Sequence, residues 1–156
     1  MSDIALRYAN ERFDFAIEDN DLARDDGLET AIHQSLFVNR RAADDDEVPG
    51  SPTDRGGSWM DSVPVVEGDR LGSRLWLLDR SKATQRTLDL AVEYSIEALQ
   101  WMIEDRVAKS VDVSADVLRD RGGNVFGYVI QPVITKPDGS VSTYRFNYTW
   151  AAQEAA

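Results

Sequence analysis

The chain has 156 residues, of which 42% are hydrophobic and 29% charged, and its formal net charge is −11. These values predict a single globular domain over residues 1–156, and the acidic excess disfavours nucleic acid and anionic membranes as partners, because like charges repel. The chain has no cysteine and one histidine, His33, which excludes disulfides, thiol nucleophiles and most metal or acyl-transfer chemistry.

The first residues predict an antiparallel hairpin. Apolar and polar residues alternate over Ile4–Tyr8 and again over Phe13–Ile17, on the two sides of a polar turn at Asn10-Glu11. Alternation with a period of two is typical of strands that have one buried face.

A helix is predicted after the hairpin. Asp26 and Glu29 have the spacing of a capping box, and apolar residues recur at helical spacing over Leu28–Leu36. We expect the helix to end near Arg40-Arg41, where basic side chains suit a C-terminal end.

Residues 42–70 predict a long irregular loop. This stretch holds three of the five prolines, four glycines and the acidic run Asp44–Glu47. Loops of this length are usually either disordered or functional. A solvated, mobile insertion is one interpretation, but Trp59 favours a functional loop, since disordered segments are poor in aromatic residues.

The middle of the chain contains two apolar segments with different patterns. Residues Leu71–Leu78 are apolar nearly all round and fit either a short buried helix or a central strand. Residues 84–107 predict a long amphipathic helix. Its main apolar stripe consists of Leu88, Ala91, Val92, Ser95, Ile96, Leu99, Met102 and Ile103.

The C-terminal third predicts a three-stranded meander, with strands over residues 111–117, 125–134 and 141–150. A Pro-Asp-Gly turn at Pro137–Gly139 joins the last two strands. The expected fold is therefore α+β: a mostly antiparallel sheet, made of the N-terminal hairpin and the C-terminal meander, packed with two or three helices.

Paired carboxylates are the only catalytic apparatus that the composition permits. On the long predicted helix, Glu97 and Glu104 are separated by about 10 Å along the axis, which is wide even for an inverting glycosidase. Glu93 and Glu97 belong to one polar face, so a solvated helix surface explains them. His33 and Glu29 could share a metal, but a third ligand is missing, and an exposed histidine is the preferred interpretation. We expect no metal, no cofactor and no catalytic residue.

Apolar residues on the polar sides of the predicted helices are candidates for a partner interface. Phe37 is opposite the stripe of the first helix, and Leu90, Tyr94 and Trp101 form a second line on the long helix. Aromatic lines of this kind are typical anchors for partner proteins. A second layer within the chain, formed by the Trp59 loop or by residues 75–78, is the alternative.

The last predicted strand offers a second candidate surface. Its aromatic residues share one face, which we expect to be buried, and the opposite face presents Thr143, Arg145 and Asn147. Pro132 interrupts the preceding strand and predicts an edge or a bulge there, because proline cannot donate to a ladder.

Six segments in order resemble the Mu-type phage tail baseplate family, which is related to the T-even wedge component that initiates the contractile sheath. They are Asp26–Ala31 with Arg40-Arg41, Arg55–Asp61, Gly72–Leu78, Glu97–Asp105, Pro137–Ser140 and the closing aromatic strand that ends at Trp150. The resemblance covers nearly the whole chain. Ser58 stands where many members have a second tryptophan of the loop motif.

The resemblance implies a structural subunit of a contractile injection machine. It implies six copies around the tail tube, contacts with wedge and hub proteins, and a sheet that accepts a strand from the first sheath ring. The expected location is the virion tail baseplate, after assembly in the host cytoplasm; the N-terminus carries no secretory signal pattern. The alternative function is a lysozyme-like glycoside hydrolase that uses the helix carboxylates.

Overall fold

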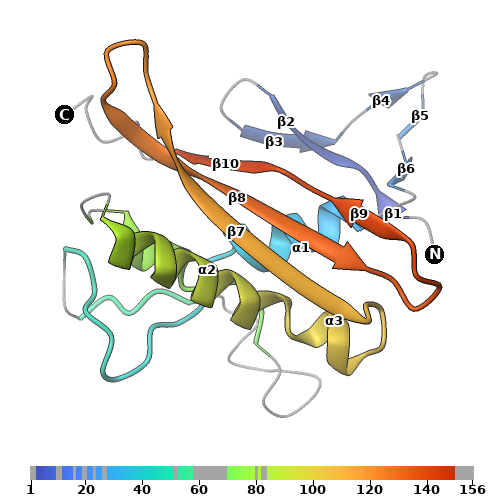
Figure 1. The fold of residues 1–156 in the computed structure, drawn as a ribbon, viewed down its shortest axis with the longest axis horizontal. Coiled ribbons are helices and arrows are strands. Elements are labelled where there is room, and N and C mark those ends of the chain that lie inside the picture. Colours follow the sequence, from blue (N-terminus) through green and yellow to red (C-terminus); the bar gives the residue numbers. More distant parts are fainter. Residues whose placement is uncertain are drawn as a thin grey trace. The chain divides into compact units, whose positions relative to one another are not determined.

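The computed structural model describes residues 3–9, 12–15, 17–18, 21–22, 24–25, 28–50, 53–57, 70–79, 81 and 84–149. Contacts group the chain into two compact units, residues 1–34 and residues 35–156. The elements in chain order (Figure 1) are β1 (Asp3–Ile4), β2 (Leu6–Ala9), β3 (Arg12–Phe15), β4 (Ile17–Glu18), β5 (Asp21–Leu22), β6 (Arg24–Asp25), α1 (Glu29–Phe37), the 3-10 helix η2 (Leu75–Leu78), α2 (Gln85–Leu99), α3 (Trp101–Glu104), β7 (Ser110–Arg119), β8 (Val125–Thr135), β9 (Val141–Thr143) and β10 (Phe146–Thr149). This content confirms the predicted α+β class.

The first unit contains three short antiparallel pairs: β2 with β3, β1 with β6, and β4 with β5. The pairing of β2 with β3 sets Leu6 opposite Phe15 and Tyr8 opposite Phe13, which confirms the middle of the predicted hairpin. Its outer residues differ from the prediction, since Ile4 pairs with Arg24, Ile17 pairs with Leu22, and both isoleucines are exposed. Its turn residues and the predicted cap Asp26 lie outside the described residues.

The second unit is built on an antiparallel sheet in which β8 is the central strand. β7 pairs with β8 along one side, and β9 and β10 pair with its other side, one after the other. The predicted meander is thus confirmed, but its last strand is divided in two at Tyr144-Arg145.

Pro132 lies in the central strand, so the prediction that it marks an edge is wrong. Its carbonyl oxygen accepts a hydrogen bond from Tyr144 N at 3.0 Å, on the side of β9 and β10. The N–H and C=O of a strand residue point to the same side, so the donor that proline lacks would face this side too. The register is continuous across this point, since Val133 is opposite Thr143 and Ile130 is opposite Phe146, so the missing donor removes one ladder bond beside the break between β9 and β10.

The long predicted helix is two helices. Thr84 Oγ1 accepts a hydrogen bond from Thr87 N at 3.3 Å and caps α2. α2 ends at Leu99, and α3 follows after a turn at Gln100 and ends at Glu104, before the predicted Val107. Within the part of the chain that is described, no helix combines the length and apolarity needed to cross a membrane.

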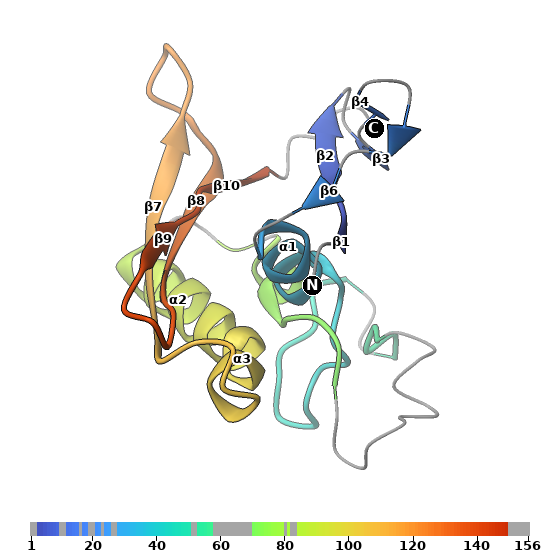
Figure 2. The same cartoon turned by 90° about the vertical axis from the view of Figure 1, so that its right-hand side faces the viewer.

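α2 lies along the sheet and contacts β7 and β8 (Figures 1 and 2). Side chains that meet in this core are fully or nearly fully buried: Ala91, Ser95, Leu99, Met102, Tyr128, Ile130 and Ile134. Two members of the predicted stripe do not join it, since Ile96 is 40% exposed and Ile103 is 37% exposed. α2 presents small residues such as Ala91 and Ser95 to the strands, so the buried face of the helix is narrower than the predicted stripe.

α1 ends at Phe37, three residues before the predicted end, because the next residues pair with a distant segment. Arg40 N donates to Ser73 O at 2.9 Å, and Ser73 N donates to Val38 O at 2.9 Å. Gly72 has φ +90°, and a Cβ there would lie 2.1 Å from Val38 O. Only glycine allows this close approach.

The residues after this pairing form a short buried helix, one of the two structures predicted for Leu71–Leu78. Leu75, Leu77 and Leu78 of η2 are buried. Part of the predicted 42–70 loop is ordered by Arg55, whose guanidinium donates to the carbonyl oxygens of Ala43 and Asp44. Trp59 lies outside the described residues.

Candidate interaction surface

β7 is an edge strand of ten residues that pairs with β8 on one side. This pairing shows which of its backbone groups point to the other, open side. Val113 is opposite Pro132, whose backbone groups point away from β7. The pair is therefore a non-hydrogen-bonded one, and the N–H and C=O of Val113 point to the open edge. Because the direction of the backbone groups alternates along a strand, the N–H and C=O of Val111, Ala115 and Val117 also point to the open edge.

One of these outward donors is already occupied. Val117 N donates to Asp116 Oδ1 at 2.7 Å. The outward amides of Val111, Val113 and Ala115 have no hydrogen-bond partner within the described ranges. The open edge thus presents three consecutive free donor positions and ends at a position that a carboxylate covers.

The sheet face that Asp112, Ser114 and Asp116 share is exposed on β7. Cross-strand pairing extends this face in rows, because directly opposite residues point to the same side. Asp112, Val133 and Thr143 form one row, and Asp116, Val129 and Asn147 form another. The predicted surface residues Thr143 and Asn147 are therefore on the same face as the two aspartates of the edge strand.

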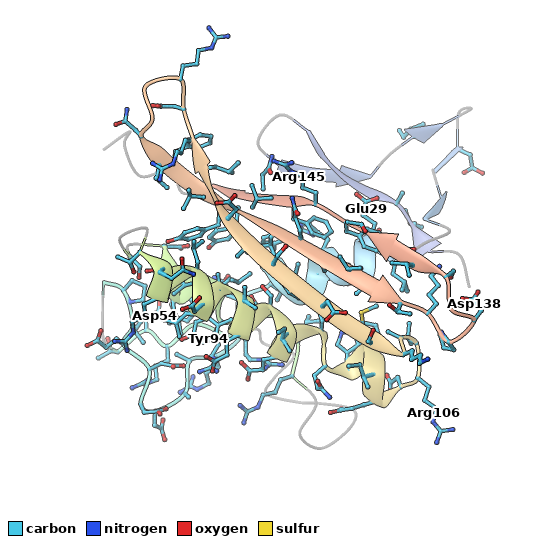
Figure 3. The ribbon with its side chains drawn as sticks, viewed as in Figure 1. Glu29, Asp54, Tyr94, Arg106, Asp138 and Arg145 are labelled. Atoms are coloured by element: carbon cyan, nitrogen blue, oxygen red, sulfur yellow. The ribbon has the colours of Figure 1, made fainter. Side chains whose placement is uncertain are left out.

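Thr143, Arg145 and Asn147 are exposed, as the sequence predicts. Arg145 lies at the break between β9 and β10 (Figure 3). This side of the sheet offers a shorter and interrupted edge, since β9 has three residues and β10 has four.

The predicted helix anchors are engaged inside the chain. The Phe37 ring stacks on Tyr148 with centroids 5.7 Å apart and meets Phe146 edge-on at 5.8 Å. Trp101 Nε1 donates to Ser35 Oγ at 3.0 Å. Tyr94, on α2 (Figure 3), is 8% exposed, and the Arg74 guanidinium lies 4.5 Å from its ring centroid.

Tyr94 and Trp101 thus contact Arg74 and Ser35 of the chain itself, whereas the Trp59 loop named in the alternative lies outside the described residues. Leu90 is half-buried. None of these three offers a large free apolar surface, whereas Asp112, Ser114 and Asp116 on the outer face of β7 are exposed.

An ion-pair network joins α2 to two distant segments. Glu97 Oε1 binds Arg40 Nη1 at 2.9 Å, and Glu97 Oε2 binds Arg74 Nη2 at 2.9 Å. Arg74 Nη1 also binds Asp46 Oδ1 at 3.0 Å. Two carboxylate oxygens that are held by two guanidinium groups serve packing rather than acid–base chemistry.

Glu93 and Glu104, the other carboxylates considered for catalysis, are exposed on α2 and α3. Within the described ranges, no three side chains of histidine, aspartate or glutamate gather closely enough to hold a metal ion. His33 is half-buried rather than exposed, and burial lowers its pKa from 6.5 to about 4.

Sequence reasoning missed the β7 edge. The signal is present in the alternation of Val111, Val113 and Val117 with Asp112 and Asp116, since charges on the open face are a common protection of edge strands. The order of strands in the sheet was needed to recognise it.

The family model described as "Phage protein GP46" matches residues 28–141, which include α1, α2, β7 and β8. The chain belongs to this family. "Baseplate protein gp46" of Escherichia phage Mu is 42% identical over 147 residues, which cover 94% of this chain and 95% of that protein. "Mu-like prophage FluMu protein gp46" of Haemophilus influenzae is 35% identical over 151 residues, covering 97% and 99% respectively.

The comparisons confirm the resemblance seen in the sequence. The matched region contains all of β7 and β8, and hence the open edge and the ladder that orients it.

Proposed function

We propose that the protein is a structural component of the baseplate of a contractile phage tail or a related injection particle, and that β7 receives a strand from a neighbouring protein. The observation that carries the proposal is the ten-residue strand β7, which pairs along one side only among the described residues. A relative that is 42% identical over 94% of this chain is named a baseplate protein, which supports the same place for this one.

Strand addition suits the chemistry of this edge. The free N–H and C=O groups of an edge strand form a template, and a partner strand satisfies them through backbone bonds while side chains determine specificity. Val111, Val113 and Ala115 each direct a backbone N–H and C=O to the open edge, which is enough to align a short segment of a partner strand. β9 and β10 are shorter and are interrupted between them, so they are the weaker acceptor.

The resemblance to sheath-initiating proteins gives this edge a partner. In our proposal the first sheath ring donates the strand, and sheath assembly begins there. Wedge and hub proteins and the tail tube contact other faces of the protein, with six copies in each particle. The particle is assembled in the cytoplasm of the bacterial host, and the protein has no enzymatic role.

The decisive experiment changes one outward donor. Val113→Pro removes an N–H that points to the open edge and leaves the ladder to β8 intact. We expect the variant to fold with an unchanged circular dichroism spectrum and to enter baseplates, but we expect the tails to lack sheath in electron micrographs.

The matched control is Val113→Ala, which loses the side chain and keeps the N–H. It should give sheathed tails. Ser114→Pro should unfold the sheet, because its N–H belongs to the ladder with β8. Sheathed tails with folded Val113→Pro would show that β7 is not the acceptor.

A further inference from the structure

Neither aspartate of β7 is opposite a charged residue of β8. Asp112 is opposite Val133 and Asp116 is opposite Val129. Both carboxylates are exposed, and neither forms an ion pair with a described residue. Because the two residues are four apart in a strand, they lie on one face. A strand added at the open edge would place one of its residues beside each aspartate.

We propose that Asp112 and Asp116 determine which strand binds β7, and that the preferred segment carries two basic residues four positions apart on one face. The inference rests on the strand addition proposed above. A strand that pairs with β7, in either direction, places residues four apart beside the two carboxylates. Opposite charges in directly facing positions stabilise a strand pair, whereas like charges destabilise it.

The same aspartates disfavour a second copy of this chain that pairs about Ser114. Antiparallel pairing of β7 with itself about Ser114 would set Asp112 of one copy opposite Asp116 of the other, twice. The net charge of −11 adds a general repulsion between copies. The partner is therefore a basic strand from another protein.

Asp116 has a second effect, on the length of the pairing. Its Oδ1 accepts the outward N–H of Val117 at 2.7 Å, so an incoming strand cannot use this donor while the carboxylate is there. A lysine or arginine opposite Asp116 draws the carboxylate to itself and frees the N–H. A strand without this cation ends its pairing at Ala115.

The test uses the full-length, isotope-labelled protein and three synthetic ten-residue peptides of alternating threonine and valine. The first peptide carries lysines four positions apart, the second carries glutamines at the same positions, and the third carries lysines three apart, on opposite faces. Binding is measured by titration, and pairing by protection of the Val111, Val113 and Ala115 amides from hydrogen exchange.

We expect the first peptide to bind about fivefold tighter than the second at low salt, the sum of two cross-strand charge pairs. The preference should shrink at high salt. Only the first peptide should also protect the Val117 amide. The double variant Asp112→Asn with Asp116→Asn should lose the preference, and Glu93→Gln, which removes a charge from α2, should keep it.

The outcomes separate the two proposals. Equal protection of the three amides by all three peptides would leave strand addition standing and overturn the selection by charge. Equal binding of the first and third peptides would also overturn the selection by charge, because the attraction would then not depend on the spacing of the lysines. Protection of none of the three amides by any peptide would overturn strand addition at β7 and the inference together.

Discussion

Arg40 and Glu97, which are 57 positions apart, form an ion pair with an Nη1–Oε1 distance of 2.9 Å. Arg74 binds the second oxygen of the same carboxylate. The segment that follows α1, the segment before η2 and the last turn of α2 are thus joined at one side chain. The arginine side chains are 12% and 19% exposed and the Glu97 side chain is 40% exposed, so the network is partly shielded from water.

Glu97→Gln should lower the free energy of unfolding by about 1–2 kcal/mol, because two partly buried guanidinium groups lose their carboxylate. Urea denaturation measures this loss. Glu104→Gln is the matched control, since it removes the same charge from an exposed position, and it should change stability by less than about 0.5 kcal/mol. Equal effects of the two variants would mean that the network contributes only through net charge.

Gly72→Ala should destabilise the protein by about 3 kcal/mol or more. The substitution places a Cβ 2.1 Å from Val38 O and forces a residue with a side chain to keep φ +90°. Gly123→Ala is the control for the backbone angle alone, because Gly123 has φ +83° and a Cβ added there would meet no atom within 4 Å. It should cost about 1 kcal/mol. Thermal unfolding of both variants separates the clash from the strain.

Trp101 and Ser35 should be coupled in a double-mutant cycle. Trp101→Phe removes the indole donor and keeps most of the ring, and Ser35→Ala removes the acceptor. We expect a coupling free energy of about 1 kcal/mol, the usual value for a hydrogen bond inside a protein. Trp76→Phe with Ser35→Ala is the control, since Trp76 Nε1 donates to Arg40 O instead. No coupling in the first cycle would make Trp101 a candidate partner anchor again.

Much of the fold could be predicted from local pattern. The alternation over residues 111–117, the Pro-Asp-Gly turn and the helical spacing over residues 84–99 each depend on neighbours in sequence, and each is confirmed. The position of Pro132 could not be predicted in this way. Its missing donor faces the break between β9 and β10, and which strand lies in the centre is a property of the assembled sheet.

The candidate surface, too, could be predicted only where local sequence pattern determines it. Thr143, Arg145 and Asn147 are exposed as predicted, because a single strand already shows which residues share a face. Tyr94 and Trp101 were ambiguous, since a helix alone does not reveal that Arg74 and Ser35 pack on its second side. The β7 edge depends on which strand is outermost, and one sequence without strand order does not contain that information.

The purified protein should not clear peptidoglycan. Both carboxylate oxygens of Glu97 are held by Arg40 and Arg74, and Glu93 and Glu104 are exposed, so none of the three has the apolar surroundings that raise the pKa of a catalytic acid. A turbidity assay on cell walls tests this expectation, with an authentic lysozyme as positive control. Clearing that disappears in Glu97→Gln or Glu104→Gln would instead establish the hydrolase alternative.

The stability of the protein should fall between pH 6.5 and pH 5 because of His33. Burial lowers its pKa to about 4, whereas the unfolded chain has an ordinary value of 6.5, so the unfolded state binds the proton first as the pH falls. The contribution is therefore complete above pH 6.5 and is lost progressively below it, by about 1–2 kcal/mol at pH 5. His33 is the only histidine in the chain, and ordinary carboxylates titrate mainly at lower pH. Urea denaturation across this range measures the loss, and His33→Gln should flatten the profile between pH 6.5 and pH 5 even if it lowers stability at every pH. An unchanged slope in that variant would assign the pH dependence to the acidic residues instead.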